Sequence, residues 1–397
     1  MRVAPSFALV LLLAAPLYAD RVRVVVVTQP QSNIRANVIS ALDRATDVEP
    51  WGDGAAFAAE IDREDLDALR NDSHVRAIAI DDGGGAGLTE SLPHIGADAV
   101  HLQGIDGRGT TVAVLDSGID TDHPAFTGRI TGEACFCDNL NGTGCCPGGV
   151  TVRIGTGSAE DDQGHGTHVA GIVSGVAPST YLVAVKVLDS ANRFNSFTQI
   201  YRALEWIADH RPEVDAINMS LGSDALVTDA DCGSHAVALG LQPVISRLRE
   251  RGVLIAASSG NNGATDRMWL PACMSEVLGV GATFDNADNV ATFTNSSVSL
   301  DLLAPGVSIT STARGGGTTT LSGTSMAAPH VAGLIALMKQ VGGRAFPSSS
   351  IQTILENSGK PVVDPRNSLT VPRIDALVTI AATPPKPPAP RRRAVRH

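Results

Sequence analysis

From about residue 91 onward, short apolar stretches alternate with longer segments in which apolar residues recur at helical spacing. The apolar stretches are typical of buried strands, and they predict strands at residues 110–115, 180–187, 216–219, 253–257 and 277–280. The longer segments predict helices at residues 165–174, 197–209, 236–251 and 325–340. This alternation predicts an α/β fold with a parallel central sheet and helices on both faces. In sheets of this type, active sites lie beyond the carboxyl ends of the strands.

The last of these helices is apolar on every side. Residues 321–338 run from small residues into Val-Ala-Gly-Leu-Ile-Ala-Leu-Met, so we expect a helix buried in the middle of a domain. Gly323 and Thr324 precede Ser325, and a tight turn there places the serine hydroxyl at the helix N-terminus, a favourable position for a nucleophile. A Thr or Ser that only caps the helix gives the same local pattern. Pro329 is expected in the first turn, where its missing N–H costs little.

The chain before residue 83 has a pattern of its own. It predicts strands at residues 21–28, 55–61 and 75–81 and helices at residues 33–45 and 63–70, which together form a small α+β unit. The run Gly-Gly-Gly-Ala-Gly at residues 83–87 follows this unit. Such a run predicts a flexible linker that is open to cleavage.

Both ends of the chain carry segments that we do not expect to pack. Residues 1–19 combine Arg2, an apolar run and a final Ala19, which predicts a secretory signal peptide cleaved after Ala19. The apolar run is too short to span a bilayer, so we expect a secreted protein, extracellular or periplasmic. Residues 383–397 are rich in Pro and Arg and predict a disordered tail, either inert or a sorting or anchoring signal.

The composition narrows the classes of function. Of the 397 residues, 43% are hydrophobic and 18% are charged, as expected of a globular protein with a sizeable core. The formal net charge of -11 argues against a general nucleic-acid binder, because such proteins cluster Lys and Arg against phosphate. Apart from the buried helix, no second segment is long and apolar enough to cross a membrane. We therefore expect neither nucleic acid nor a membrane as a partner.

The chain contains six cysteines. Because we expect it to be exported to an oxidising compartment, we expect these cysteines to form disulfides. Two of them stand apart in the chain, and Cys232 can pair with Cys273. The other four crowd one loop, at positions Cys135, Cys137, Cys145 and Cys146. Zinc is the competing interpretation for this loop, but Cys-x-Cys and adjacent Cys-Cys lack the usual spacing of zinc-binding motifs.

Three more polar residues stand where strands end or helices begin. Asp116 ends an apolar strand, where it is either a strand-end cap or a desolvated carboxylate that needs a partner. His165 lies between glycines at the start of a helix. A lone histidine is usually a hydrogen-bonded core residue, and we assign this role to His168. His165 and His168 together could also bind a metal, but no third ligand stands out in the sequence. Asn261 follows a strand in Gly-Asn-Asn-Gly, which is either a turn or a source of an amide donor at the end of the sheet that carries Asp116.

Together with Ser325, these residues are the parts required for acyl transfer. Serine is a weak nucleophile unless a base removes its proton, and a third group must hold that base in one tautomer. The tetrahedral oxyanion needs preorganised hydrogen-bond donors. A carboxylate, an imidazole, an amide and a serine at a helix N-terminus supply each of these functions.

Four sequence blocks carry a family resemblance over about residues 91–377. They are Val-Leu-Asp-Ser-Gly-Ile-Asp around Asp116, Gly-His-Gly-Thr-His-Val-Ala-Gly around His165, Ser-Gly-Asn-Asn-Gly around Asn261 and Gly-Thr-Ser-Met-Ala-Ala-Pro-His around Ser325. In composition and order they resemble the subtilisin-like serine peptidases. The resemblance implies that Ser325 is the nucleophile, His165 the general base and acid, and Asp116 the residue that orients His165. Asn261 and the Ser325 amide then form the oxyanion hole.

The resemblance also implies a domain order and a substrate-binding edge. Residues 218–222 are similar to the segment that pairs with the substrate backbone, so Ser220, Leu221 and Gly222 are expected to line the cleft. Residues 20–88 are similar to the family's inhibitory propeptide, which assists folding and then occupies the cleft. The peptidase domain is then residues 89–382, with self-cleavage near Leu88 in the window 83–90.

The chain also departs from the family. Ala125 follows His123-Pro124 where many members have an acidic residue, and residues 171–178 run straight through the position of an inserted calcium-binding loop. We therefore assign no metal or cofactor; a structural calcium stays open, although the commonest site is missing. Some relatives place an acid where Asn262 stands, and this acid helps them to accept basic side chains; the neutral Asn262 favours apolar residues at the cleaved position. No acidic cluster of the prohormone-processing type is present, so we expect broad specificity.

We therefore expect a secreted, monomeric serine endopeptidase that is made as a self-processing zymogen and acts on proteins or peptides. One alternative is a catalytically silent peptide-binding protein on the same fold. Another is a lipase or esterase on a different fold, which is disfavoured because no Gly-x-Ser-x-Gly surrounds Ser325.

Overall fold

The computed structural model describes residues 21–28, 45–51, 56–62, 65, 68–69, 72–80, 88–139 and 141–386. The chain divides into two compact units, Met1–Gly85 and Ala86–His397. Several predicted features lie wholly or largely outside the described residues: the signal peptide, the helices at 33–45 and 63–70, the glycine run at 83–87 and most of the tail. Their assignments stay predictions.

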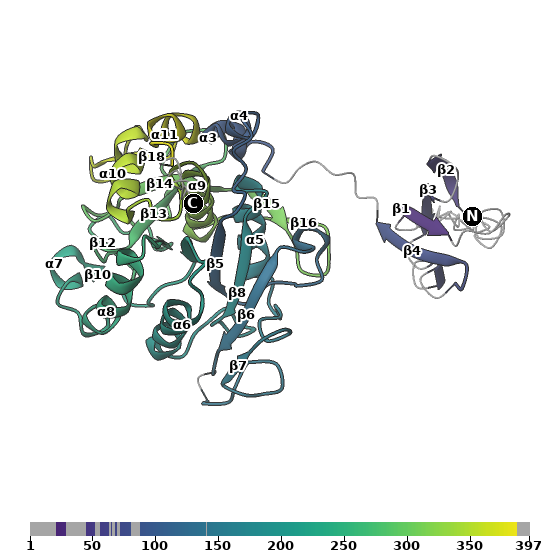
Figure 1. The fold of residues 1–397 in the computed structure, drawn as a ribbon, viewed down its shortest axis with the longest axis horizontal. Coiled ribbons are helices and arrows are strands. Elements are labelled where there is room, and N and C mark those ends of the chain that lie inside the picture. The colour runs from purple at the N-terminus through teal and green to yellow at the C-terminus, as the bar shows by residue number, and fades with distance from the viewer. Residues whose placement is uncertain are drawn as a thin grey trace, which may run out of the picture. The chain divides into compact units, whose positions relative to one another are not determined.

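The first unit contains an antiparallel sheet in the order β2-β3-β1-β4 (Figure 1). Its strands are β1 (Arg21–Thr28), β2 (Thr46–Trp51), β3 (Ala56–Asp62) and β4 (Val75–Ile80). Alternate residues of β1 and β3, such as Val24 and Ile61, are buried in one small core. The three predicted strands are confirmed. The sequence analysis missed β2, because Thr-Asp-Val-Glu-Pro-Trp has no continuous β-branched run.

The second unit is built on a ten-stranded sheet in the order β17-β18-β14-β13-β11-β9-β5-β8-β6-β7. Its strands are β5 (Thr111–Asp116), β6 (Ile130–Phe136), β7 (Val152–Ile154), β8 (Tyr181–Lys186), β9 (Ala216–Met219), β11 (Leu254–Ser258), β13 (Leu278–Phe284), β14 (Leu302–Val307), β17 (Lys360–Val363) and β18 (Thr370–Arg373). All neighbours from β18 to β6 pair in parallel, and the two edge pairs are antiparallel. The predicted parallel sheet is therefore confirmed, with antiparallel edges added.

Helices cover both faces of this sheet, as predicted (Figure 1). The helices α5 (His165–Val176) and α9 (Thr324–Gly342) pack on one face, and α6 (Phe197–His210) and α8 (Ala236–Glu250) pack on the other. Side chains of β5 alternate between the two cores: Val112 and Val114 face α5 and α9, whereas Ala113 and Leu115 face α6 and α8. A strand that is buried on both faces has a continuous apolar sequence, which is why the hydrophobic pattern predicted β5.

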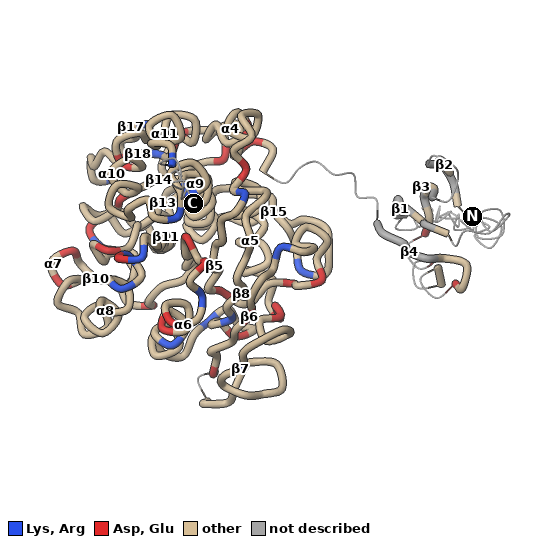
Figure 2. The backbone as a smooth tube through the Cα atoms, in the orientation of Figure 1, with Lys and Arg blue, Asp and Glu red and all other residues tan. Residues whose placement is uncertain are grey.

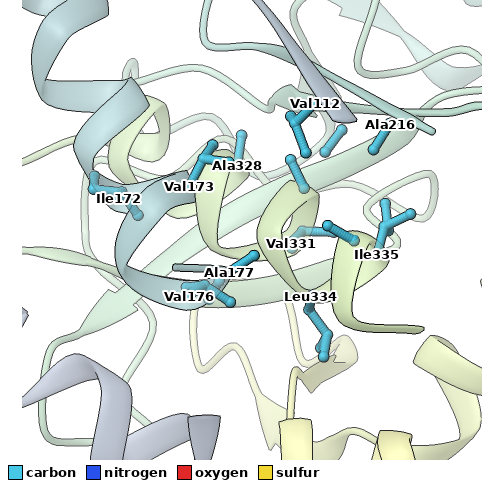
Figure 3. Packing of buried hydrophobic residues seen from close by; sticks show 14 of the residues in the cluster. Val112, Ile172, Val173, Val176, Ala177, Ala216, Ala328, Val331, Leu334 and Ile335 are labelled. Carbon is cyan, nitrogen blue, oxygen red and sulfur yellow. The ribbon is translucent and has the colours of Figure 1, made fainter. Parts of the chain in front are cut away.

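Helix α9 is the centre of the larger core. Nearly all of its residues are buried, as its apolar pattern predicts. Figure 3 shows Ala328 and Val331 of α9 against Val173 and Val176 of α5, with Val112 of β5 beside them. This packing fixes the N-terminus of α9 beside the carboxyl ends of the strands, where a site is expected.

Shorter elements complete the second unit. They are α3 (Ser91–Ile95), α4 (Ala97–His101), the 3-10 helix η2 (Pro124–Phe126), β10 (Val227–Thr228), α7 (Asp229–Cys232), β12 (Arg267–Met268), β15 (Ile309–Thr312), β16 (Thr318–Leu321), α10 (Ser348–Ser358) and α11 (Ala376–Ala382). They were not predicted, because each is short or only weakly periodic.

Charged residues of both signs are interspersed over the second unit (Figure 2). One cluster joins distant parts of the chain: Asp288 contacts His94 of α3 at 3.0 Å, Arg373 of β18 at 2.8 Å and Lys360 of β17 at 2.5 Å. Burial raises the pKa of Asp288, but the hydrogen bonds of Lys360 and Arg373 and the charges of Arg373 and His94 outweigh burial and lower this pKa to about 2. The cluster thus ties the first helix of the unit to its last strands.

All six cysteines form disulfides, Cys135–Cys146, Cys137–Cys145 and Cys232–Cys273. The disulfide prediction is confirmed, and the four-cysteine loop has no free thiol for zinc. Within the described ranges, no group of three or more His, Cys, Asp or Glu side chains could hold a metal ion. Among the helices of the same ranges, none has the length and apolar character needed to cross a bilayer.

Candidate active site

The four candidate residues come from four elements that meet at the carboxyl edge of the sheet. Asp116 is the last residue of β5, His165 the first residue of α5, and Ser325 lies in the first turn of α9. Asn261 follows β11 after a short connection. His165, Asn261 and Ser325 all line one cleft of about 710 Å³, and Asp116 is fully buried behind His165.

Asp116 and His165 form a direct hydrogen bond. Nδ1 of His165 lies 2.7 Å from Oδ1 of Asp116, which also accepts the Ser117 N–H at 2.8 Å. The Asp116 side chain has no exposed surface, and the His165 side chain is 12% exposed. Burial lowers the pKa of His165, but the charge of Asp116 and its hydrogen bond outweigh burial, and the pKa lies above the usual value. Asp116 therefore stabilises the protonated imidazole.

Glycines beside His165 allow helix α5 to approach the end of β5. A side chain at Gly166 would place its Cβ atom 2.0 Å from the Gly118 carbonyl oxygen, which no residue other than glycine permits. The Gly166 N–H donates to Ser117 Oγ at 2.9 Å in this close contact. Gly166 thus permits the approach of the two segments that carry the pair, whereas Gly164 supplies the left-handed backbone angle, φ 109°, just before His165.

Asp161 is a positioning residue that the sequence analysis missed. Its buried carboxylate accepts hydrogen bonds from Ser117 Oγ, from Thr167 and from the Gln163 and Gly164 amides, at 2.6 to 3.0 Å. It therefore fastens the loop before His165 to the segment after Asp116. Asp161 is the first residue of the run Asp-Asp-Gln-Gly, which could have indicated this role. An acid two or three residues before a glycine turn commonly accepts hydrogen bonds from the turn amides.

Ser325 and Ser220 exchange two hydrogen bonds. Ser220 Oγ donates to the Ser325 carbonyl at 2.7 Å, and Ser325 Oγ donates to the Ser220 carbonyl at 3.3 Å. The Ser325 carbonyl is available because Pro329, four residues on, has no N–H to donate in the helix. The expected place of Pro329 in the first turn is thus wrong; it lies in the second turn. Neither Thr324 nor Ser325 caps the helix by its side chain, so the capping alternative is also wrong.

The side-chain amide of Asn261 is held by its oxygen. Oδ1 accepts from the Thr324 N–H and from Thr324 Oγ1, both at 2.9 Å. The NH₂ group is thereby left for the cleft. A Cβ atom built on Gly323 would lie 3.5 Å from Asn261 Nδ2 and 3.7 Å from the Ser325 amide nitrogen, so both donors lie beside the same small space.

The remaining predicted residues, Ser220, Leu221 and Gly222, also line the cleft. Among the described residues no hydrogen bond joins Ser325 Oγ to His165; the two groups share the cleft but the serine hydroxyl is turned to Ser220. Hydrogen bonds of this kind are often unformed without substrate.

His168 has the core role that its sequence position predicts. Its Nε2 lies 3.1 Å from the Ile309 carbonyl and 3.0 Å from that of Thr319. Burial lowers its pKa to about 4, so the ring is neutral at ordinary pH. The ring links α5 to the β15–β16 hairpin and lies outside the set that lines the cleft.

Comparison with known proteins places this geometry in a family. A model of the subtilase family matches residues 107–375. The chain belongs to the subtilase family. Among its subtilase relatives, M-protease of Shouchella clausii is 37% identical over 297 residues, covering 72% of this chain and 69% of that protein. Subtilisin E of Bacillus subtilis is 36% identical over 299 residues, covering 71% of this chain and 70% of that protein.

A solved subtilase structure agrees with the fold. The crystal structure of a cold adapted subtilisin-like serine proteinase matches with a TM-score of 0.55 at 28% identity, covering 68% of this chain and 90% of that one. The chain is thus a serine endopeptidase of the subtilisin type with a subtilisin-like fold. The alternative of a lipase or esterase on a different fold is set aside.

Proposed function

We propose that the chain hydrolyses peptide bonds through an acyl-enzyme on Ser325, with His165 as general base and acid and Asp116 as its orienting group. The observation that carries this proposal is the 2.7 Å contact of His165 with the buried Asp116, in a cleft that also contains Ser325 and Asn261. Asp116 accepts the Nδ1–H of His165, which leaves Nε2 free to accept a proton.

The reaction follows from these positions. The Ser325 hydroxyl leaves the Ser220 carbonyl, gives its proton to His165 Nε2 and attacks the substrate carbonyl carbon. The negative oxygen of the tetrahedral intermediate accepts from Asn261 Nδ2 and the Ser325 N–H. His165 then protonates the leaving amine, and a water molecule, deprotonated by the same ring, hydrolyses the ester.

The substrate is an extended stretch of protein or peptide. Its backbone pairs with residues 220–222 at the cleft wall, as an added strand. The relatives are named as proteases and subtilisins, which supports a protein substrate here.

The same proposal includes export and self-processing. Residues 1–19 direct secretion, residues 20–88 fold as an inhibitory propeptide, residues 89–382 form a monomeric peptidase and residues 383–397 are its tail. The predicted disorder does not hold for the start of this tail, because Thr383 is buried and the Lys386 N–H donates to the Val341 carbonyl at 2.7 Å. Ser325 makes the cut between residues 83 and 90. Leu88 is only 4% exposed and belongs to the core of the second unit, so the mature enzyme keeps this contact only if the cut precedes Leu88.

Intact mass and N-terminal sequencing of the secreted protein test this proposal. The wild type is compared with Ser325→Ala and with Ser349→Ala, a control at an exposed serine of α10, in a protease-deficient host. We expect the wild type and the control to begin between residues 83 and 90, and Ser325→Ala to begin at residue 20.

Two outcomes contradict the proposal. Wild type that stays uncut after Ala19 and leaves denatured protein intact favours the silent peptide-binding protein. Cleavage of all three forms shows that another protease performs the maturation, and self-processing is then wrong.

A further inference from the structure

The cleft contains a slot whose mouth lies at Ser325. Strands β9 and β11 are neighbours, paired in parallel up to Met219 and Ala257. Beyond the sheet their continuations form two walls, residues 220–223 and 259–261. The first turn of α9 bridges the walls, because Ser325 bonds Ser220 whereas Thr324 bonds Gly260 and Asn261.

This position identifies what enters the slot. A carbonyl carbon attacked by Ser325, with its oxygen beside Asn261 Nδ2, lies at the mouth. The Cα atom bonded to this carbonyl carbon carries the side chain of the same residue. We expect this side chain to enter the space between the walls. The slot therefore selects the residue on the amino side of the cleaved bond.

Trp269 and Leu270 line the cleft and connect the two walls of the slot. The Trp269 N–H donates to the Ser259 carbonyl of one wall at 3.0 Å. The Ser223 N–H of the other wall donates to the Leu270 carbonyl at 2.9 Å, and the Leu270 N–H donates back to Ser223 Oγ at 3.0 Å. Both walls are thus bonded to the segment that carries the indole.

The indole itself lies between the walls. A Cβ atom on Gly222 would be 2.7 Å from Trp269 Cβ and 3.0 Å from Cε3, and one on Gly260 would be 2.6 Å from Trp269 Cδ2 and 2.8 Å from Cε2. These distances place the two Cβ positions within about 7 Å of each other, which is room for one ring in contact on both sides. Glycine at both positions is what admits the tryptophan.

We propose that Trp269 is a specificity residue that fills the slot, so that the enzyme cleaves after residues with small side chains, Gly, Ala or Ser. This inference rests on the proposed function and narrows the broad, apolar preference expected from the sequence. A benzyl or isobutyl group must displace an indole whose backbone N–H is bonded to one wall and whose neighbour Leu270 is bonded to the other. Such a displacement lowers kcat/KM, since the transition state for large side chains no longer fits.

Peptides that differ only at the residue before the cleaved bond test the inference. We compare Ala, Leu and Phe in the wild type, in Trp269→Ala and in Trp206→Ala. Trp206 lies on α6, outside the cleft lining, and supplies a matched loss of an indole. Trp269 Nε1 has no hydrogen-bond partner among the described residues, so Trp269→Ala breaks no side-chain hydrogen bond. A covalent fluorophosphonate probe counts active sites at Ser325 in each preparation.

We expect the wild type to cleave the Ala peptide at least tenfold better, in kcat/KM, than the Phe peptide. Trp269→Ala should raise kcat/KM for Leu or Phe at least tenfold while the value for Ala changes less than threefold, and Trp206→Ala should keep the wild-type ratio. A wild type that prefers Phe or Leu overturns the inference even if Trp269→Ala does not fold, as does a folded Trp269→Ala with an unchanged ratio. Absence of both labelling and cleavage in the wild type overturns the proposed function together with the inference.

Discussion

Thr324 offers a sharp test of the oxyanion hole, because it contacts Asn261 and never the substrate in the proposed reaction. It is fully buried, and its Oγ1 donates to Asn261 Oδ1 at 2.9 Å while accepting the Gly260 N–H at 3.2 Å. Its own N–H also donates to Asn261 Oδ1 at 2.9 Å. Two donors thus hold the oxygen end of the amide and turn Nδ2 to the cleft.

The substitution Thr324→Val keeps the shape and removes the hydroxyl. One hydrogen bond to Asn261 is lost, at about 1 kcal/mol, and the buried Gly260 N–H is left unpaired, at roughly 1–3 kcal/mol. We therefore expect the free energy of unfolding to fall by about 2–4 kcal/mol in all. The backbone donor to Asn261 remains, so kcat should fall only about tenfold, against roughly 100- to 1,000-fold for Asn261→Ala, the size known for loss of one such donor in a subtilisin.

A double-mutant cycle measures the coupling. Values of kcat are determined for the wild type, each single variant and the double variant, with active sites titrated. Unfolding in urea is followed in an inactive Ser325→Ala background to avoid self-digestion. If Thr324 acts through Asn261, adding Thr324→Val to Asn261→Ala changes kcat less than twofold. A full tenfold effect in that background, or an unchanged kcat in folded Thr324→Val, refutes the reasoning.

Three further predictions follow from other contacts. Replacing Cys232 and Cys273, which are 41 residues apart, by serine should lower the free energy of unfolding by roughly 4 kcal/mol, measured by denaturant unfolding of the inactive protein; a loss below 1 kcal/mol contradicts the chain-entropy argument. Activity requires neutral His165, whose pKa is raised, so kcat/KM should fall as pH drops through that pKa. In Asp116→Asn the charge of Asp116 and its ionic hydrogen bond are lost, and only the charge of Asp161 still raises the pKa of His165 while burial lowers it. The residual activity should therefore keep its acid limb at lower pH than the wild type; an unmoved limb argues against His165 as the titrating base. Lys186→Met removes a buried ammonium that donates to two carbonyls and to the Asp162 carboxylate at 2.7 to 2.9 Å, and roughly 2–4 kcal/mol of stability should be lost in the same unfolding assay; unchanged stability means that water replaces the ammonium.

The sequence by itself determined the layered α/β architecture and the four candidate residues. Central strands such as β5 are buried on both faces, so a continuous apolar run marks them, and glycines mark the turns where Asp116 and His165 approach each other. Five strands of the large sheet escaped prediction. Three of them, β6, β14 and β18, lie inside the sheet, and the two edge strands, β7 and β17, are short and largely exposed. Their strand conformation depends on hydrogen bonds to a neighbour, which no local pattern records.

Only the tertiary structure decided how the candidate residues are held and what surrounds them. Asp161 joins the segments that carry Asp116 and His165. Thr324 orients the side-chain amide of Asn261, 63 residues earlier in the chain. Trp269 lies in a slot whose two walls continue from different strands, β9 and β11. Each contact joins residues far apart in sequence. Local propensity depends on near neighbours, whereas these contacts exist only once the sheet has set the order of its strands and α9 has packed across them.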